Sequence, residues 1–80
     1  MRWVFKKNSE NQNVIEIGYS YGTDDSCDGV ITYDKSKEEL KLKRLSESAS
    51  ELKSERAFQY IYGLLDDNEL TYKKYIVCTG

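Results

Sequence analysis

The sequence contains no histidine, no proline and only two cysteines. Without histidine, the chain lacks the usual general base, the commonest metal ligand and the side chain that titrates near neutral pH. Without proline, it has no cis-proline turn and no proline-rich docking segment. Cys27 and Cys78 form no CxxC pair, and secreted domains of this size carry denser disulfide frameworks. The cysteine usage therefore predicts free thiols and a cytoplasmic location.

A large charge of one sign and a long apolar run are also missing. The net charge is −2, from 14 acidic and 12 basic residues, whereas nucleic-acid-binding domains carry a clustered basic excess. The longest N-terminal apolar run, at residues 3–5, is followed at once by lysines. A membrane span needs roughly 18 apolar residues and a signal peptide about 7–15. We therefore expect no membrane association and no secretion signal, and nucleic acid is disfavoured as a partner.

The chain does contain enough apolar surface for one compact domain over residues 1–80. Apolar residues make up 39% of the sequence and charged residues 32%, a balance typical of globular chains. The seven tyrosines are an unusual load. Tyrosine combines a large contact area with a polar tip and is enriched at interfaces. We expect Tyr19 and Tyr21 in the core or at its edge, and one or two of the others at the surface.

Alternation of apolar and polar residues predicts strands. It is clearest at residues 14–21, and shorter candidates are residues 3–6, 30–33 and 71–78. The polar residues 8–13 predict a turn or loop. The first three strands indicate an antiparallel meander.

Residues 39–45 fit two interpretations. They alternate well enough for a fourth strand, yet leucines at 42, 45 and 52 also follow helical spacing. The second interpretation requires a helix of about 28 residues, which is far above the usual length. The serines at 46, 48 and 50 favour a break, because serine prefers caps and turns. We therefore prefer a strand followed by a separate helix.

That helix carries an apolar stripe and recognisable ends. The stripe consists of Leu52, Ala57, Ile61 and Leu64. Ser48 with Glu51 matches a capping box, Ser50 is a competing N-cap, and Asn68 suits a left-handed C-terminal cap. The predicted fold class is thus α+β, an antiparallel meander of four or five strands with one helix packed on one face.

The acidic loop at residues 24–29 resembles the front half of an EF-hand calcium loop. Asp24, Ser26 and Asp28 occupy the first, third and fifth positions, but the twelfth position holds Lys35 instead of a bidentate glutamate. We therefore interpret the segment as a hairpin loop and predict no metal site and no cofactor. Cys27 lies in the same loop, where its aspartate neighbours disfavour the thiolate, so it is expected to be inert. Cys78 is expected to be a small core residue.

A second acidic group follows the helix. Asp66, Asp67 and Glu69 stand at its C-terminal end, where the negative end of the helix dipole disfavours carboxylates. Tyr62 lies off the main apolar stripe of the same helix. The plain interpretation is a solvated loop, and the functional one is an acidic patch that meets a basic surface on a partner.

These observations predict a non-enzymatic protein-binding module. The sequence has no glycine-rich phosphate loop and no nucleophile elbow, and a chain of this size rarely encloses a substrate pocket. The expected activity is that of a small inhibitor or regulator that occludes a larger protein. The predicted partner-binding residues are Tyr62, Asp66, Asp67, Glu69, Asp24, Asp25 and Asp28. A self-associating homodimer is the alternative, and a weak nucleic-acid binder is a more distant one.

Overall fold

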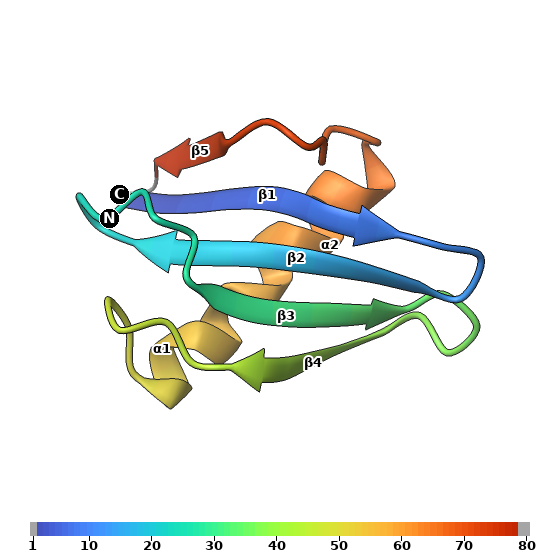
Figure 1. The fold of residues 1–80 in the computed structure, drawn as a ribbon, viewed down its shortest axis with the longest axis horizontal. Helices are drawn as coiled ribbons and strands as arrows, with labels where there is room; N and C mark the ends of the chain where they lie inside the picture. The colour runs from blue at the N-terminus through green and yellow to red at the C-terminus, as the bar shows by residue number, and fades with distance from the viewer. Residues whose placement is uncertain (1, 79–80) are drawn as a thin grey trace.

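The computed structural model describes residues 2–78, which form one antiparallel sheet covered by helices (Figure 1). The elements along the chain are β1 (Arg2–Glu10), β2 (Val14–Tyr21), β3 (Gly29–Asp34), β4 (Glu39–Arg44), α1 (Glu51–Arg56), α2 (Phe58–Asp66) and β5 (Tyr75–Cys78). The sheet has five strands in the order β4-β3-β2-β1-β5, and all neighbours are antiparallel. The predicted α+β class and the meander are confirmed.

The ambiguous residues 39–45 form strand β4, as preferred. Leu40 lies opposite Tyr33 and Leu42 opposite Ile31, so the leucines share the face that carries the core. A register shift between Val30 and Ile31 adds one residue to this ladder. Residues 39–44 therefore form a strand and not a helix, because β3 supplies hydrogen-bond partners for their backbone and packing partners for their leucines.

Strand β1 is longer than predicted. It continues to Glu10, with Ser9 opposite Glu16 and Glu10 opposite Ile15. Its register shifts between Lys7 and Ser9, and the extra residue is Asn8. The polar residues that suggested a loop are tolerated because this end of the strand is more exposed than its start. Only residues 11–13 remain as the connection to β2.

The helices form a nearly continuous run over residues 51–66, interrupted at Ala57. The N-cap is Ser50, whose hydroxyl accepts the Lys53 amide at 3.2 Å. Ser48 is not the cap, because its hydroxyl accepts the amide of Tyr21 instead, at 2.8 Å. At the other end, Asn68 has a φ of 56°, as the predicted left-handed cap requires.

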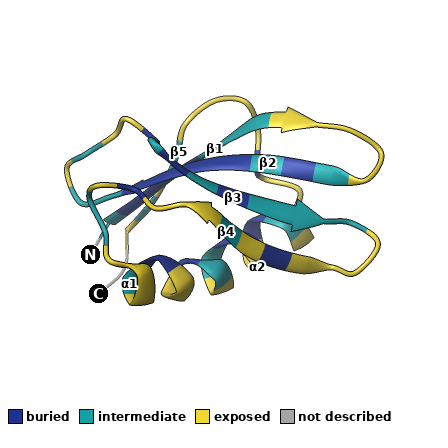
Figure 2. Cartoon of the chain, turned by 60° about the horizontal axis from the view of Figure 1, so that its bottom comes forward, coloured by how far each residue is buried: buried dark blue, intermediate teal, exposed yellow. Residues whose placement is uncertain are grey.

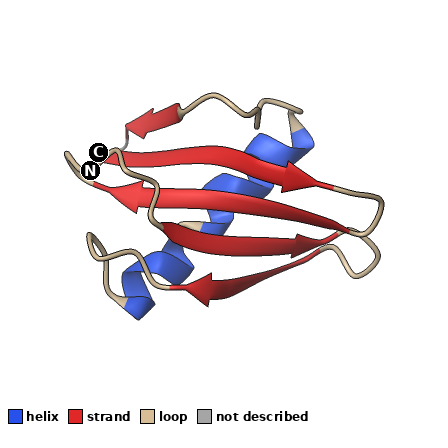
Figure 3. Cartoon of the chain, in the orientation of Figure 1, coloured by secondary structure: helices blue, strands red, loops and turns tan. Residues whose placement is uncertain are grey.

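The core lies between this helical run and one face of the sheet (Figures 2 and 3). The buried side chains of this layer are Trp3, Phe5, Ile15, Ile17, Tyr19, Ile31, Leu40, Ala57, Ile61, Leu64 and Leu70. The prediction that Leu52 joins the apolar stripe is wrong, since it is 66% exposed. Ser54 is buried in α1 because the Tyr19 hydroxyl bonds its Oγ at 2.7 Å.

The opposite face of the sheet carries no helix, and part of it is covered by the loop between β2 and β3 (Figure 1). A Cβ at Gly18 would lie 3.0 Å from the Cys27 carbonyl oxygen and 3.1 Å from Asn8 Oδ1. Gly18 therefore lets this loop approach the sheet closely. We call this side of the sheet the open face.

The last strand is shorter than predicted, because residues 71–74 leave the ladder after Thr71 accepts the Lys7 amide at 2.7 Å. Cys78 was expected in the core but is exposed, since it shares a face with Ile76 and that face points away from the helices. Among the described residues, no helix is long and apolar enough to cross a membrane.

Candidate functional site

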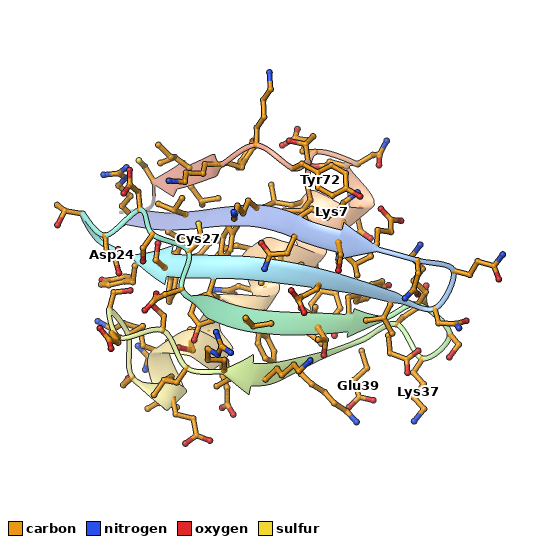
Figure 4. The ribbon with its side chains drawn as sticks, in the orientation of Figure 1. Lys7, Asp24, Cys27, Lys37, Glu39 and Tyr72 are labelled. Atoms are coloured by element: carbon orange, nitrogen blue, oxygen red, sulfur yellow. The ribbon has the colours of Figure 1, made fainter. Side chains whose placement is uncertain are left out.

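The predicted acidic residues fall into two groups at opposite ends of the sheet. Asp24, Asp25 and Asp28 belong to the loop that follows β2, and Asp24 marks that end in Figure 4. Asp66 is the last residue of α2, and Asp67 and Glu69 follow it, at the other end of the sheet (Figure 1). The fold thus brings the members of each group together but does not join them into a single acidic surface.

Asp28 connects two loops of the structure. Its carboxylate accepts the Ser46 hydroxyl at 2.6 Å and the Glu47 amide at 3.1 Å. The hydrogen bond from Ser46 is the main cause that holds the pKa of Asp28 below its usual value. The Ser46 amide in turn donates to the Tyr19 hydroxyl at 3.0 Å. The Asp28 carboxylate therefore already has protein partners within the fold.

Asp24 and Asp25 differ in how they are held. The Asp24 carboxylate accepts the Ser26 amide at 3.0 Å, which closes the loop locally. The Asp25 side chain is largely exposed and lies 4.0 Å from the Lys74 ammonium. Within residues 2–78, no group of three or more histidine, cysteine, aspartate or glutamate side chains could hold a metal ion.

Cys27 is buried in this loop near Val4 (Figure 4). Burial is the main reason that the pKa of its thiol is raised, and the nearby aspartate adds only a little. From the sequence we had expected the neighbouring aspartates to be the main reason that the thiolate is disfavoured. The hydroxyl of Ser20 and, after it, the charges of Lys74 and Lys6 oppose the rise.

Tyr62 covers the outer side of β4. Its hydroxyl accepts the Leu40 amide at 3.1 Å and donates to the Glu38 carbonyl at 3.3 Å. Its ring meets Tyr33 edge-on at 6.3 Å between centroids, and the residue remains 37% exposed. Tyr62 is thus a partly exposed residue whose polar tip has a role inside the fold.

The acidic group after α2 is also partly engaged. Glu69 accepts the Tyr75 hydroxyl at 2.6 Å, and this hydrogen bond raises the pKa of Tyr75. Asp67 is the C-cap of α2, where the Asn68 conformation allows the Glu69 amide to reach the Leu64 carbonyl at 2.9 Å. The left-handed conformation of Asn68 and this hydrogen bond end α2 and turn the chain.

Two hollows are present on the described surface. One, of about 210 Å³, lies beside the end of α2, and its charged lining consists of Lys7, Glu10, Lys35 and Asp66. The other, of about 370 Å³, lies on the open face, with Glu16, Asp28, Lys43 and Arg44 as its charged lining. Each lining combines two cations with two carboxylates. Neither hollow therefore selects a ligand by net charge.

The edge formed by β5 carries the feature that the sequence did not single out. Tyr72 and Ile76 are 62% and 51% exposed, and Cys78 is exposed as well. The Lys7 ammonium lies 5.4 Å from the centroid of the Tyr72 ring (Figure 4). β5 borders β1 on one side and has no strand on the other among the described residues. We call residues 72–78 the β5 edge.

The β5 edge could not be recognised from residue types alone. Tyr75 and Val77 face the core, whereas Ile76 and Cys78 face the other way, as the alternation along a strand requires. Nothing in the sequence fixed β5 as an outer strand. Comparison with protein families, curated proteins and solved structures finds no match to this chain.

Proposed function

We propose that this chain is a non-enzymatic protein-binding module that inhibits or regulates a larger protein by occupying part of its surface. The observation that carries the proposal is the β5 edge, where Ile76 in the outer strand and Tyr72 just before it are both more than half exposed. Exposed strand edges pair with strands of other chains, and exposed aromatic residues anchor interfaces.

The two acidic groups are the weaker candidates for the contact surface. Asp28, Glu69 and the Tyr62 hydroxyl already have hydrogen-bond partners within the chain. Asp66, Asp67 and Asp25 remain available, and they lie at two separate ends of the sheet. They suit the rim of an interface, where charges steer the approach of a partner more than they add affinity.

The test is capture of a partner from the source cell, with two matched variants. Tagged wild type is compared with Tyr72→Ala/Ile76→Ala and with Asp66→Lys/Asp67→Lys, and the retained proteins are quantified by mass spectrometry. We expect one larger protein in a stoichiometric amount, and we expect the first variant to lose it. Loss in the second variant alone would place the contact at the end of α2, and recovery of no partner by wild type would contradict the proposed function.

Self-association is the second candidate, because the same open edge could pair with its copy. A symmetric dimer would join two β5 strands in antiparallel orientation. Sedimentation equilibrium of the purified chain distinguishes the two candidates: a monomer mass at micromolar concentration favours the heterologous partner, and a dimer mass favours self-association.

A further inference from the structure

We propose that the β5 edge binds an extended acidic segment of the partner, which pairs with β5 as an additional strand. This inference rests on the proposed function, since it names the chemistry of the partner that the module binds. It draws on the direction of the backbone groups of β5, the charges beside it and the facing of its side chains.

Among residues 2–78, no strand pairs with the outer side of β5. The Arg2 carbonyl accepts the Gly22 amide at 2.8 Å, so Arg2 directs its backbone groups toward β2. Successive residues of a strand alternate, so Trp3 directs its groups toward β5, where it lies opposite Val77. Val77 therefore bonds inward, and Ile76 and Cys78 direct their N–H and C=O groups outward. The bond from the Lys7 amide to Thr71 agrees with this alternation.

These outward groups are a short template for one more strand. β5 has four residues, so an added segment gains a few backbone hydrogen bonds and needs side-chain contacts for the rest of its affinity. Ile76 supplies one such contact, because its exposed side chain lies beside the outward N–H and C=O groups. The added segment should therefore place an apolar side chain next to Ile76.

The charges beside β5 are mainly positive. Arg2 lies opposite Cys78, and Lys6 follows Phe5, which lies opposite Tyr75. Lys73 and Lys74 immediately precede β5, and both are exposed. Two carboxylates also lie here: Glu69 accepts the hydroxyl of Tyr75, whose side chain packs on the helix side of the sheet, and Asp25 lies 4.0 Å from Lys74. A segment with carboxylates would complement this charge, while a basic segment would be repelled.

The same charges disfavour a second copy as the occupant. In an antiparallel β5 pair, the lysines that precede one β5 approach the end of the other β5, where Arg2 of that copy lies opposite Cys78. Adjacent strands are about 4.8 Å apart, so these cations would be about 10 Å from one another. Both ends of the symmetric pair would bring positive charges together, within about one Debye length.

The probe for the test is a library of random linear peptides displayed on their own mRNA. It is selected on the full chain and counter-selected on Ile76→Pro, which removes an outward N–H and leaves the inward bonds of β5 intact. We expect enriched peptides to alternate acidic with apolar residues. Replacing their Asp and Glu by Asn and Gln should weaken binding about tenfold at low salt, and high salt should reduce this difference.

Charge reversal supplies a matched pair of variants. Lys73→Glu/Lys74→Glu should abolish binding of the acidic peptides, whereas Lys41→Glu/Lys43→Glu on β4 makes the same change in net charge and should leave binding intact. Because Ile76→Pro also removes a side chain, Ile76→Ala serves as its control and should retain part of the affinity. In the wild-type chain, a bound peptide should slow hydrogen exchange at the amides of Ile76 and Cys78, which tests the pairing without any variant.

Several results would overturn the inference. These are no enrichment, enrichment of neutral or basic peptides, equal binding to Ile76→Pro, and unchanged exchange at Ile76 and Cys78. A wild-type dimer that Ile76→Pro dissociates would assign the edge to a second copy instead. The proposed function fails separately: a partner lost only in Asp66→Lys/Asp67→Lys keeps the function and refutes the acidic strand. Conversely, if acidic peptides bind the β5 edge but no cellular partner is captured, the inference about the edge stands and the proposed function is refuted.

Discussion

Strands β4 and β5 both lie at an edge of the sheet, yet their outer sides are protected differently. On β4, the Tyr62 hydroxyl bonds the Leu40 amide and the Glu38 carbonyl, and the register shifts beside Val30. Lys41 and Lys43 are exposed on this strand, and exposed lysines are a usual protection of an edge. On β5, the exposed side chains include Ile76 and Cys78, and Tyr72 stands just before the strand.

The difference shows how a small sheet directs association to one side. Lysines, bulges and covering side chains are the usual means of preventing edge-to-edge pairing, and β4 has all of them. β5 has only its short length and the lysines that precede it. An unprotected strand edge with an exposed apolar side chain is a template for pairing with another chain, so the contrast supports a binding role for β5.

The largest expected effect separates the inner and outer sides of β5. Val77→Pro should remove an inward hydrogen bond and packing against the core, lowering the free energy of unfolding by about 3 kcal/mol. Ile76→Pro should lower it by less than about 1 kcal/mol, because only an outward N–H is lost. Urea denaturation followed by circular dichroism measures both. Equal losses would mean that the alternation of β5 differs from that inferred here.

The next effect concerns the packing of the Tyr19 ring beside Gly29 of β3. A Cβ at Gly29 would lie 2.2 Å from the Tyr19 ring, so Gly29→Ala should displace that ring and its hydrogen bonds to Ser46 and Ser54. We expect a loss of about 1–3 kcal/mol in unfolding free energy, measured by urea denaturation. Gly63→Ala is the control, since nothing lies within 4 Å of its added Cβ. An unchanged stability in Gly29→Ala would show that the ring can move without cost.

A smaller effect tests the covering of β4. Tyr62→Phe removes the hydroxyl that bonds Leu40 and Glu38, which should cost about 1 kcal/mol and speed hydrogen exchange at the Leu40 amide. Tyr72→Phe is the matched control on the other edge and should change neither quantity. Unaltered exchange at Leu40 would show that the hydroxyl does not protect this edge.

Removing the lysines of β4 should make the two edges more alike. Lys41→Thr/Lys43→Thr should change the unfolding free energy by no more than about 0.5 kcal/mol, because both side chains are at the surface. It should nevertheless promote concentration-dependent association, which sedimentation velocity detects. A variant that remains as monomeric as wild type would indicate that Tyr62 and the bulge are sufficient.

The smallest effect concerns the ion pairs of Glu10, at the end of β1. The Glu10 carboxylate accepts hydrogen bonds from the ammonium groups of Lys7 and Lys35, each at 2.6 Å. The bond from Lys35 is the largest cause that lowers the pKa of Glu10 from 4.5 to about 2. A carboxyl whose pKa falls on folding stabilises the fold above its unfolded pKa. That contribution is lost as pH falls from about 4.5 to 2.

Glu10→Gln should therefore flatten the dependence of stability on pH over this interval, with the two proteins converging near pH 2. Urea midpoints recorded across the range measure the effect. Asp28→Asn is the comparison, since the lowered pKa of Asp28 predicts the same direction from hydrogen bonds instead of ion pairs. Parallel curves for wild type and Glu10→Gln would show that these exposed ion pairs do not contribute.

Much of the fold followed from the sequence because its signals were local. The alternation at β2 placed Ile15, Ile17 and Tyr19 on one face, and the core confirms it. The helix was predicted at about the right place, and its left-handed end at Asn68 is confirmed. The error at Leu52 arose where tertiary partners overrode local preference: Leu52 faces solvent, while Ser54 is buried and bonds to Tyr19.

The candidate site was less accessible from the sequence. The acidic residues stood out because clusters of charged residues can be read directly from the sequence, and their role in binding stays a prediction. The separation of the two acidic groups, the internal partners of Asp28 and the exposure of Ile76 all depend on which strands are neighbours. Residue types do not encode strand order, so the contact surface could not be chosen from them.

The sequence by itself determined the class of fold, the facing of most strands and the end of the helix, because periodicity and caps act over a few residues. The tertiary structure decided that β5 pairs with β1 at the edge of the sheet and that Tyr62 covers the opposite edge. These features join residues far apart in the chain, such as Arg2 with Cys78 and Leu40 with Tyr62. Only the closed fold brings their backbone and side-chain groups into contact.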